Sequence, residues 1–140
     1  MPLSRKLSEL ADELAAIDDV HERLSLVVER SRHTPPLPAE DRSEANRVHG
    51  CVSVVWLVSE LRDGRCYFRG DAESPVVRGL VLFLCEFFSD LPPQVVAAAE
   101  VDPLDALGLA HNLSPTRSNG LAAVRRTMRA FAHSVSPPAG

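Results

Sequence analysis

Two strand-like segments joined by a tight turn constrain the fold of this chain more than any other feature. The first, at residues 51–61, reads CVSVVWLVSEL and is rich in β-branched side chains, which favour strands. The second, at residues 65–71, reads RCYFRGD and partly alternates between apolar and polar residues. Between them stands RDG, a hairpin turn signal. The pattern predicts an antiparallel hairpin, and NRVHG at residues 46–50 is expected to add a short preceding strand.

Helical patterns precede these strands. Apolar residues recur at helical spacing over residues 7–17, and the pattern restarts at residues 17–32 with Asp19 as the expected N-cap. The next segment, residues 33–46, reads HTPPLPAEDRSEAN. Its three prolines forbid a helix and predict an extended, exposed connection between the helices and the strands.

Helical patterns also follow the strands. Ser74 and Pro75 fit the N-cap and first turn of an apolar helix that ends near Phe88. Two short helices, each opened by proline, and a last helix within residues 113–135 complete the chain. The order of helices, strands and helices predicts an α+β fold. We expect a three-stranded antiparallel meander packed with helices from both chain ends.

Length and composition fit one globular domain. The chain has 140 residues, of which 45% are hydrophobic, enough for a single core. We expect one domain over residues 1–136 and a disordered tail at residues 137–140. Aromatic residues are few and cluster between Trp56 and Phe88, so the core, with Trp56 in it, is expected there.

Charge and hydropathy exclude several classes of function. The net charge is −4 and no lysine run is present, which argues against nucleic-acid binding. The longest apolar run, VVRGLVLFLCEFF, is too short for a membrane span and carries Arg78 and Glu86. The chain begins without an apolar leader segment and has three cysteines, an odd number. We therefore expect a cytoplasmic protein with reduced thiols.

The cysteines differ in their surroundings. Cys66 stands mid-strand and Cys85 lies within the apolar helix, so both are interpreted as small buried hydrophobes. Cys51 follows Gly50 at an expected turn, near positive charge, which can stabilise a thiolate. From position alone, Cys51 is either a reactive thiol or a plain structural cysteine. The spacing contains no CxxC pair, so a metal site is not expected. No other bound cofactor is expected.

Three segments resemble the SufE/CsdE family of sulfur-acceptor proteins in order and spacing. They read LPAEDRSEANRVHGCVSVVWLV, DGRCYFRGDAESPVVRGLV and LGLAHNLSPTRSNGLAAV, and the resemblance covers nearly the whole chain. It implies a fold shared with the IscU/NifU scaffold proteins. It also implies that the chain docks on a pyridoxal-phosphate (PLP)-dependent cysteine desulfurase of the SufS/CsdA kind in a bacterial cytoplasm. Cys51 would then carry sulfur as a persulfide toward an iron–sulfur scaffold.

The resemblance also assigns supporting residues. Arg117 matches a family arginine near the cysteine loop, where it would support the thiolate or contact the donor; the alternative is a capping surface arginine. Glu73 stands where the family commonly has aspartate, and it would either hold the cysteine loop or cap the following helix. Arg47, His49 and Gly50 are expected to position the loop or support its thiolate.

Several positions depart from the family pattern. Position 49 is often lysine in the family and is histidine here, so thiolate support would weaken as the pH rises through neutrality. Val52 and Val54 replace common glutamines, which makes the expected surroundings of the thiol more apolar. These departures bear on the rate of transfer and on the choice of desulfurase.

Two other functions stay open at this point. One is a binding module that stimulates the desulfurase allosterically, with Cys51 only structural. The other is an iron–sulfur scaffold, disfavoured because three clustered ligands are missing from the sequence. The expected oligomeric state is a monomer or a homodimer.

Overall fold

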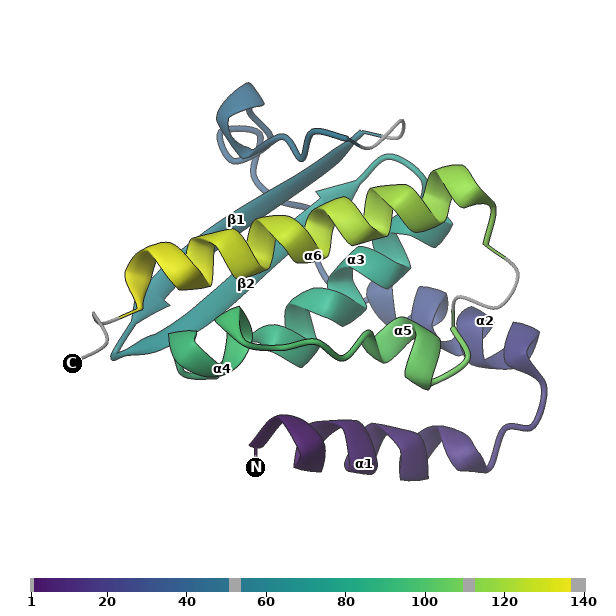
Figure 1. Ribbon diagram of the computed structural model, residues 1–140. Coiled ribbons are helices and arrows are strands. Elements are labelled where there is room, and N and C mark those ends of the chain that lie inside the picture. Colours follow the sequence, from purple (N-terminus) through teal and green to yellow (C-terminus); the bar gives the residue numbers. More distant parts are fainter. Residues whose placement is uncertain (1, 51–53, 110–112, 137–140) are drawn as a thin grey trace.

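The computed structural model describes residues 2–50, 54–109 and 113–136 of the chain. Helices precede and follow a hairpin, so the α+β class predicted from the sequence is confirmed (Figure 1). The elements in chain order are α1 (Pro2–Ala15), α2 (Val20–Ser31), the 3-10 helix η1 (Glu44–Asn46), β1 (Val55–Arg62), β2 (Arg65–Ala72), α3 (Pro75–Phe88), α4 (Pro93–Ala97), α5 (Pro103–Ala106) and α6 (Pro115–Val135).

The hairpin forms where the turn signal predicts it. β1 and β2 pair antiparallel from Val55–Ala72 at one end to Arg62–Arg65 at the other. Asp63 and Gly64 both have positive φ, 51° and 75°, as the two central residues of a tight hairpin turn require.

The prediction of a third strand is wrong, because the sheet of the described residues has two strands. The residues before the cysteine pair with β1 only through one isolated bridge, from Arg47 to Trp56. The physical reason is local, because η1 ends in a hydrogen bond from the Arg47 N–H to the Glu44 carbonyl. Only a very short stretch of chain therefore remains extended beside β1. Trp56 itself is half-buried and stays outside the core cluster, contrary to expectation.

The helices cover the hairpin unequally. α3 packs against β2 and α2, whereas α6 packs against α4, α3 and β1. In Figure 1, α6 crosses in front of the strands, and α1 lies on the side of the molecule remote from them. The core between these elements is mainly aliphatic, with Val55, Leu80 and Val124 fully buried.

One glycine permits the close packing of α3 on β2. A Cβ atom at Gly70 would lie 2.7 Å from Val81 Cγ1 and 3.2 Å from Cys85 Sγ. The first distance is shorter than real Cβ contacts, so any larger side chain would push the helix away from the strand.

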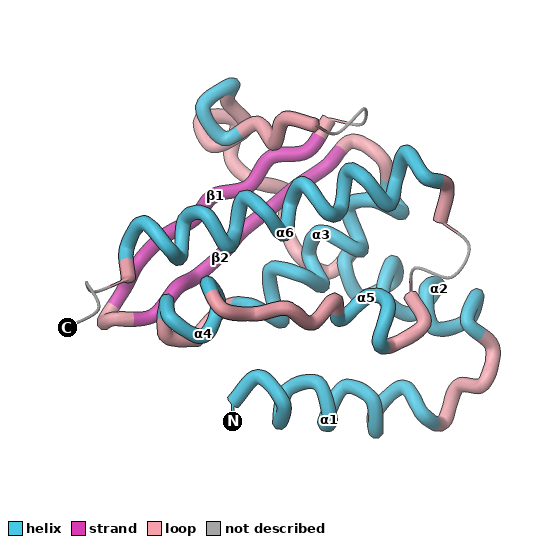
Figure 2. The backbone as a smooth tube through the Cα atoms, viewed as in Figure 1, coloured by secondary structure: helices cyan, strands magenta, loops and turns pink. Residues whose placement is uncertain are grey.

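The proline-rich connection between α2 and η1 is drawn as loop in Figure 2. Its prolines are exposed, as predicted, but Leu37 is buried among them. The Leu37 N–H donates to the Asp71 carboxylate at 3.0 Å. The connection is therefore attached to the end of β2 and does not run free over the surface.

Candidate functional site

The chain reverses direction around the predicted reactive cysteine. The Val48 N–H donates to the Val55 carbonyl at 2.9 Å, and the Arg47–Trp56 bridge lies beside this bond. The two segments flanking the reversal are thereby held side by side. Cys51 and Val52 themselves lie outside the described residues, so the structure defines the frame of the loop and not its tip.

Gly50 stands where the sequence predicts a residue of special backbone freedom. Its φ is +90°, a backbone conformation that residues other than glycine rarely adopt. A Cβ atom at this position would lie 3.5 Å from Ala123 Cβ and 3.9 Å from Arg126 Nη2, both on α6. The residue directly before Cys51 therefore lies against the middle of α6.

Arg47 lies at the base of the loop, where it forms the bridge to Trp56. Its side chain is half-buried, and its Nε is a buried donor for which the described residues provide no acceptor. Buried polar groups are normally hydrogen-bonded, so an unused donor here is unusual. It places one buried cationic N–H, unpaired among the described residues, at the base of the loop that carries the cysteine.

Glu73 is beside the loop on the opposite side. Its backbone N–H donates to the Val54 carbonyl at 3.2 Å, which ties the end of β2 to the end of the reversal. The Glu73 side chain is exposed. Ser74, at the N-cap position of α3, makes no side-chain capping hydrogen bond.

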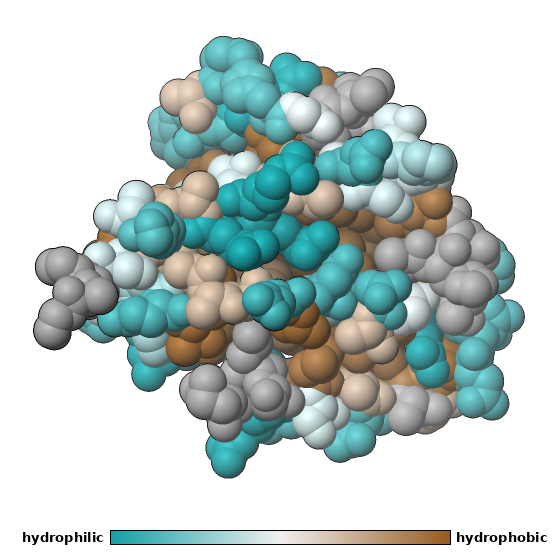
Figure 3. All heavy atoms as spheres, in the orientation of Figure 1, coloured by the Kyte–Doolittle hydropathy of each residue, from teal (hydrophilic) through white to brown (hydrophobic). Residues whose placement is uncertain are grey.

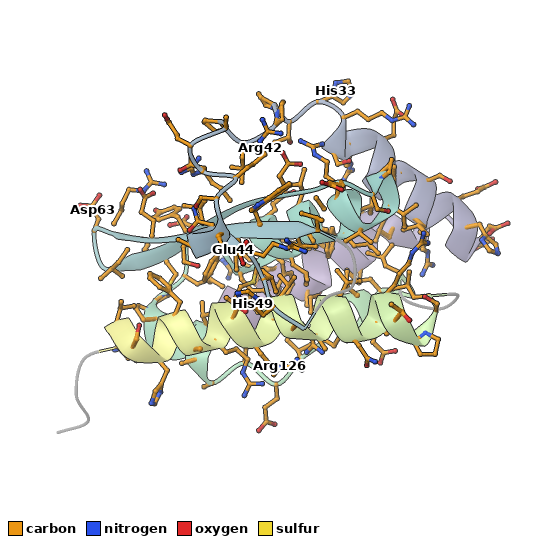
Figure 4. The ribbon with its side chains drawn as sticks, turned by 90° about the horizontal axis from the view of Figure 1, so that it is seen from above. His33, Arg42, Glu44, His49, Asp63 and Arg126 are labelled. Carbon is orange, nitrogen blue, oxygen red and sulfur yellow. The ribbon has the colours of Figure 1, made fainter. Side chains whose placement is uncertain are left out.

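Arg117 and His49 are both exposed. Arg117 lies in the first turn of α6, where its backbone N–H donates to the Ser114 hydroxyl at 3.3 Å. Ala123, the α6 residue nearest Gly50, is six positions further along, about 9 Å of helix rise. The structure thus brings Arg126, and not Arg117, next to Gly50. Figure 4 shows His49 and Arg126 beside the middle of α6.

Sequence reasoning missed the role of Arg78. Its Nε donates to Asp71 Oδ1 at 2.8 Å, and its two terminal nitrogens donate to the carbonyls of Ser31 and Thr34 at 2.6 and 2.8 Å. One arginine therefore joins α2, the proline-rich connection and β2. The signal was present, because a charge inside an otherwise apolar helix needs a buried partner.

Asp71 completes this network. It is 5% exposed and accepts hydrogen bonds from the backbone N–H groups of Leu37 and Ala72 as well as from Arg78. Burial alone raises the pKa of this carboxyl, but the hydrogen bonds from Arg78, Leu37 and Ala72 outweigh it and hold the pKa below its usual value. Asp71 is therefore a charged anchor for the strand whose end adjoins the cysteine loop.

The other two cysteines are buried, which confirms their interpretation as small hydrophobic residues. Cys66 and Cys85 are 0% and 4% exposed. Burial raises the pKa of the Cys66 thiol, and it raises the pKa of Cys85 to about 12. Neither thiol is suited to nucleophilic attack near neutral pH, because the thiolate is the reactive form.

The described residues also bear on metal binding and on membrane insertion. Within residues 2–50, 54–109 and 113–136, no three His, Cys, Asp or Glu side chains are grouped in a way that could hold a metal ion. No described helix is both long and apolar enough to cross a membrane.

Comparison with known proteins decides the family. The model of the SufE family, described as an Fe–S metabolism associated domain, matches residues 8–132. The chain belongs to the SufE family. Membership connects the chain with iron–sulfur metabolism and confirms the resemblance seen in its sequence.

Chains related to this SufE protein match it over most of their length. An uncharacterized SufE-like protein of Rhizobium etli is 34% identical, with 88% of this chain and 86% of the relative covered. Another, of Rhizobium meliloti, is 32% identical over 94% of this chain and 97% of the relative. A third, of Synechocystis, is 28% identical over 91% and 80%.

The fold of this SufE chain is also similar to that of a solved structure. The solution structure of a hypothetical protein from Thermus thermophilus aligns with a TM-score of 0.74. The alignment covers 92% of this chain and 94% of that chain, at 21% identity. The likeness supports the α+β arrangement described above.

Proposed function

We propose that this SufE-family protein accepts sulfur on Cys51 from a PLP-dependent cysteine desulfurase and passes it to an iron–sulfur scaffold. The observation that carries the proposal is the contrast among the three cysteines of the chain. Cys66 and Cys85 are buried with raised pKa values. Cys51 alone follows a glycine of positive φ within a reversal of the chain. The proposed setting is the cytoplasm, where thiols stay reduced.

The proposed reaction is a thiol–persulfide exchange. The thiolate of Cys51 attacks the outer sulfur of a persulfide on the desulfurase. A new S–S bond forms on Cys51, the S–S bond of the donor breaks, and the donor cysteine leaves as a thiolate. Sulfur moves without net oxidation or reduction, so the step needs no other oxidant and no cofactor bound to this chain.

The residues around the loop have supporting roles in this proposal. Gly50 gives the loop a backbone conformation that other residues resist. Arg47 favours the thiolate by its positive charge, and His49 helps to position the loop. Glu73 holds the loop through its backbone bond to Val54. Arg117 contacts the donor protein from the start of α6.

Intact-mass measurement tests the proposal. The protein is incubated with the cysteine desulfurase of the same organism and L-cysteine, without reductant. The wild type should gain the mass of one sulfur atom, and Cys51→Ser should gain none. Cys66→Ala is the matched control and should gain sulfur like the wild type. A Cys51→Ser protein that still acquires the extra mass would overturn the proposal.

The rate of the desulfurase reaction, measured in the same incubation, separates the alternative function. If Cys51→Ser stimulates the desulfurase as strongly as the wild type does, the chain is a binding module and Cys51 is structural. The sulfur-acceptor proposal predicts instead that stimulation is lost with the thiol, because the enzyme-bound persulfide then has no acceptor.

A further inference from the structure

Helix α6 differs in charge from the rest of the chain. It contains four arginines and one histidine but no acidic residue, although the whole chain has 19 acidic against 15 basic residues. The chain as a whole therefore has a net charge of −4, whereas the charged side chains of α6 are all basic. Such an asymmetry orients a protein in the field of a charged partner.

Three of these residues form an exposed row, which we call the basic stripe: Arg126, Arg129 and His133. Residues three and four apart are neighbours on a helix surface, so the stripe runs about 10 Å along one side of α6. The opposite side of the helix is buried in the core through Leu121 and Val124, among others. Figure 3 shows hydrophilic side chains gathered over the middle of α6.

Among the described residues, the arginines of the stripe have no carboxylate partner, unlike their neighbour on the same helix. Arg125, next to the stripe, pairs with Asp102 at 3.5 Å. No comparable carboxylate lies within ion-pair distance of Arg126 or Arg129 in the part of the chain that the structure describes. Two fixed positive charges are therefore presented to the solvent side by side.

The stripe begins at the loop of the proposed acceptor cysteine. Arg126 Nη2 lies 3.9 Å from the position of a Cβ on Gly50, the residue directly before Cys51. The half-buried Arg47 adds a further positive charge at the base of the same loop. A protein surface that reaches the loop must therefore pass beside this concentration of positive charge.

We propose that the basic stripe is the docking surface for an acidic patch on the protein that donates sulfur. The inference rests on the proposed function and adds the face and the charge by which the donor is recognised. A nucleic acid fits less well, because affinity for phosphates needs many more cationic contacts than two arginines provide. Charges at the rim of an interface act mainly on the association rate and its salt dependence.

Charge reversal of the stripe tests this docking surface. The association rate of the purified protein with the cysteine desulfurase of the same organism is measured at low and high salt. Arg126→Glu combined with Arg129→Glu should lower the rate about tenfold or more at low salt. The difference in association rate between the wild type and this variant should shrink at about 1 M salt, where the Debye length is about 3 Å. The double Gln variant should fall between the wild type and the double Glu variant.

The matched control reverses two other exposed arginines, Arg32 and Arg62, which lie at the end of α2 and on β1. Arg32→Glu combined with Arg62→Glu changes the net charge equally, so it should slow association much less. Urea unfolding of each variant excludes a folding defect. Equal slowing by the two double Glu variants, or unchanged association in the stripe variant, would overturn the inference. A wild type that associates with this salt dependence but never gains sulfur would overturn only the proposed function.

Discussion

Replacing Asp71 by asparagine tests the network that holds the proline-rich connection beside the end of β2. The Asp71 and Arg78 side chains are only 7% and 16% exposed. Asparagine keeps the shape and one acceptor oxygen but leaves the Arg78 cation without its counter-charge. Removing one partner of a buried ion pair costs about 3–5 kcal/mol of unfolding free energy. Arg78 keeps its bonds to two carbonyls, so we expect the lower end, about 3 kcal/mol.

Urea denaturation followed by circular dichroism measures this loss, which corresponds to a decrease in Tm of about 10 °C. The matched control is Asp41→Asn, because Asp41 forms a more exposed pair with Arg69 at 3.3 Å. Its loss should not exceed about 1 kcal/mol. A double-mutant cycle with Arg78→Met should give a coupling energy of about 2 kcal/mol between Asp71 and Arg78.

The outcome that refutes this reasoning is equal loss at the two sites. If Asp71→Asn costs less than about 1 kcal/mol, like the exposed pair, the buried network does not stabilise the fold as the structure indicates. A coupling energy near zero would likewise show that Arg78 is held by the carbonyls of Ser31 and Thr34 alone.

The remaining predictions concern pH, glycine and thiol reactivity. The pKa of Asp71 is lower in the folded protein than in the unfolded chain. The stability advantage of the wild type over Asp71→Asn should therefore be complete above the unfolded pKa of about 3.9, and it should be lost as the pH falls through the folded pKa. An advantage of the wild type that grows in acid would contradict this. Gly50→Ala should cost about 1–2 kcal/mol in urea unfolding from its positive φ, since the Cβ itself fits; a neutral effect would argue against the observed backbone. Gly70→Ala should cost about 1–3 kcal/mol by crowding Val81, and an unchanged urea midpoint would refute that contact. Iodoacetamide should leave the buried Cys85 unmodified until urea is added, and fast native labelling would contradict its burial.

Most elements of the fold were predictable from local signals. The RDG turn placed the hairpin correctly, because the two positive φ values at Asp63 and Gly64 suit those residues. Asp19 caps α2 through its bond to the His21 N–H at 2.8 Å, and α3 spans Pro75–Phe88 as the serine–proline start indicates. These features depend on residues near one another in the chain.

Features that depend on distant residues were missed. The third strand was predicted wrongly because the sequence does not reveal that the residues just before Arg47 form the 3-10 helix η1. The Asp71–Arg78 network joins carbonyls more than 40 positions away from Arg78, and no periodicity encodes such contacts. For the same reason the sequence does not reveal that Arg126 lies next to Gly50.

The candidate site was predictable in part. Sequence placed Arg47, Gly50 and Glu73 around one loop, and the structure brings their backbones to the two sides of the reversal. Cys51 was selected by its position after Gly50 and by resemblance to the family, and its role stays a prediction. The burial of the other two thiols was predictable from their positions, mid-strand for Cys66 and inside the apolar helix for Cys85.

The most direct test of the central claim locates the transferred sulfur on the chain. After reaction with the desulfurase and L-cysteine, iodoacetamide traps the persulfide, and trypsin is added without reductant. Cleavage after arginine gives peptides of residues 48–62, 66–69 and 79–117, each with one cysteine. The account predicts the extra sulfur on the peptide that contains Cys51. Extra sulfur on the peptide of Cys66 or Cys85, or on none of the three, would contradict it.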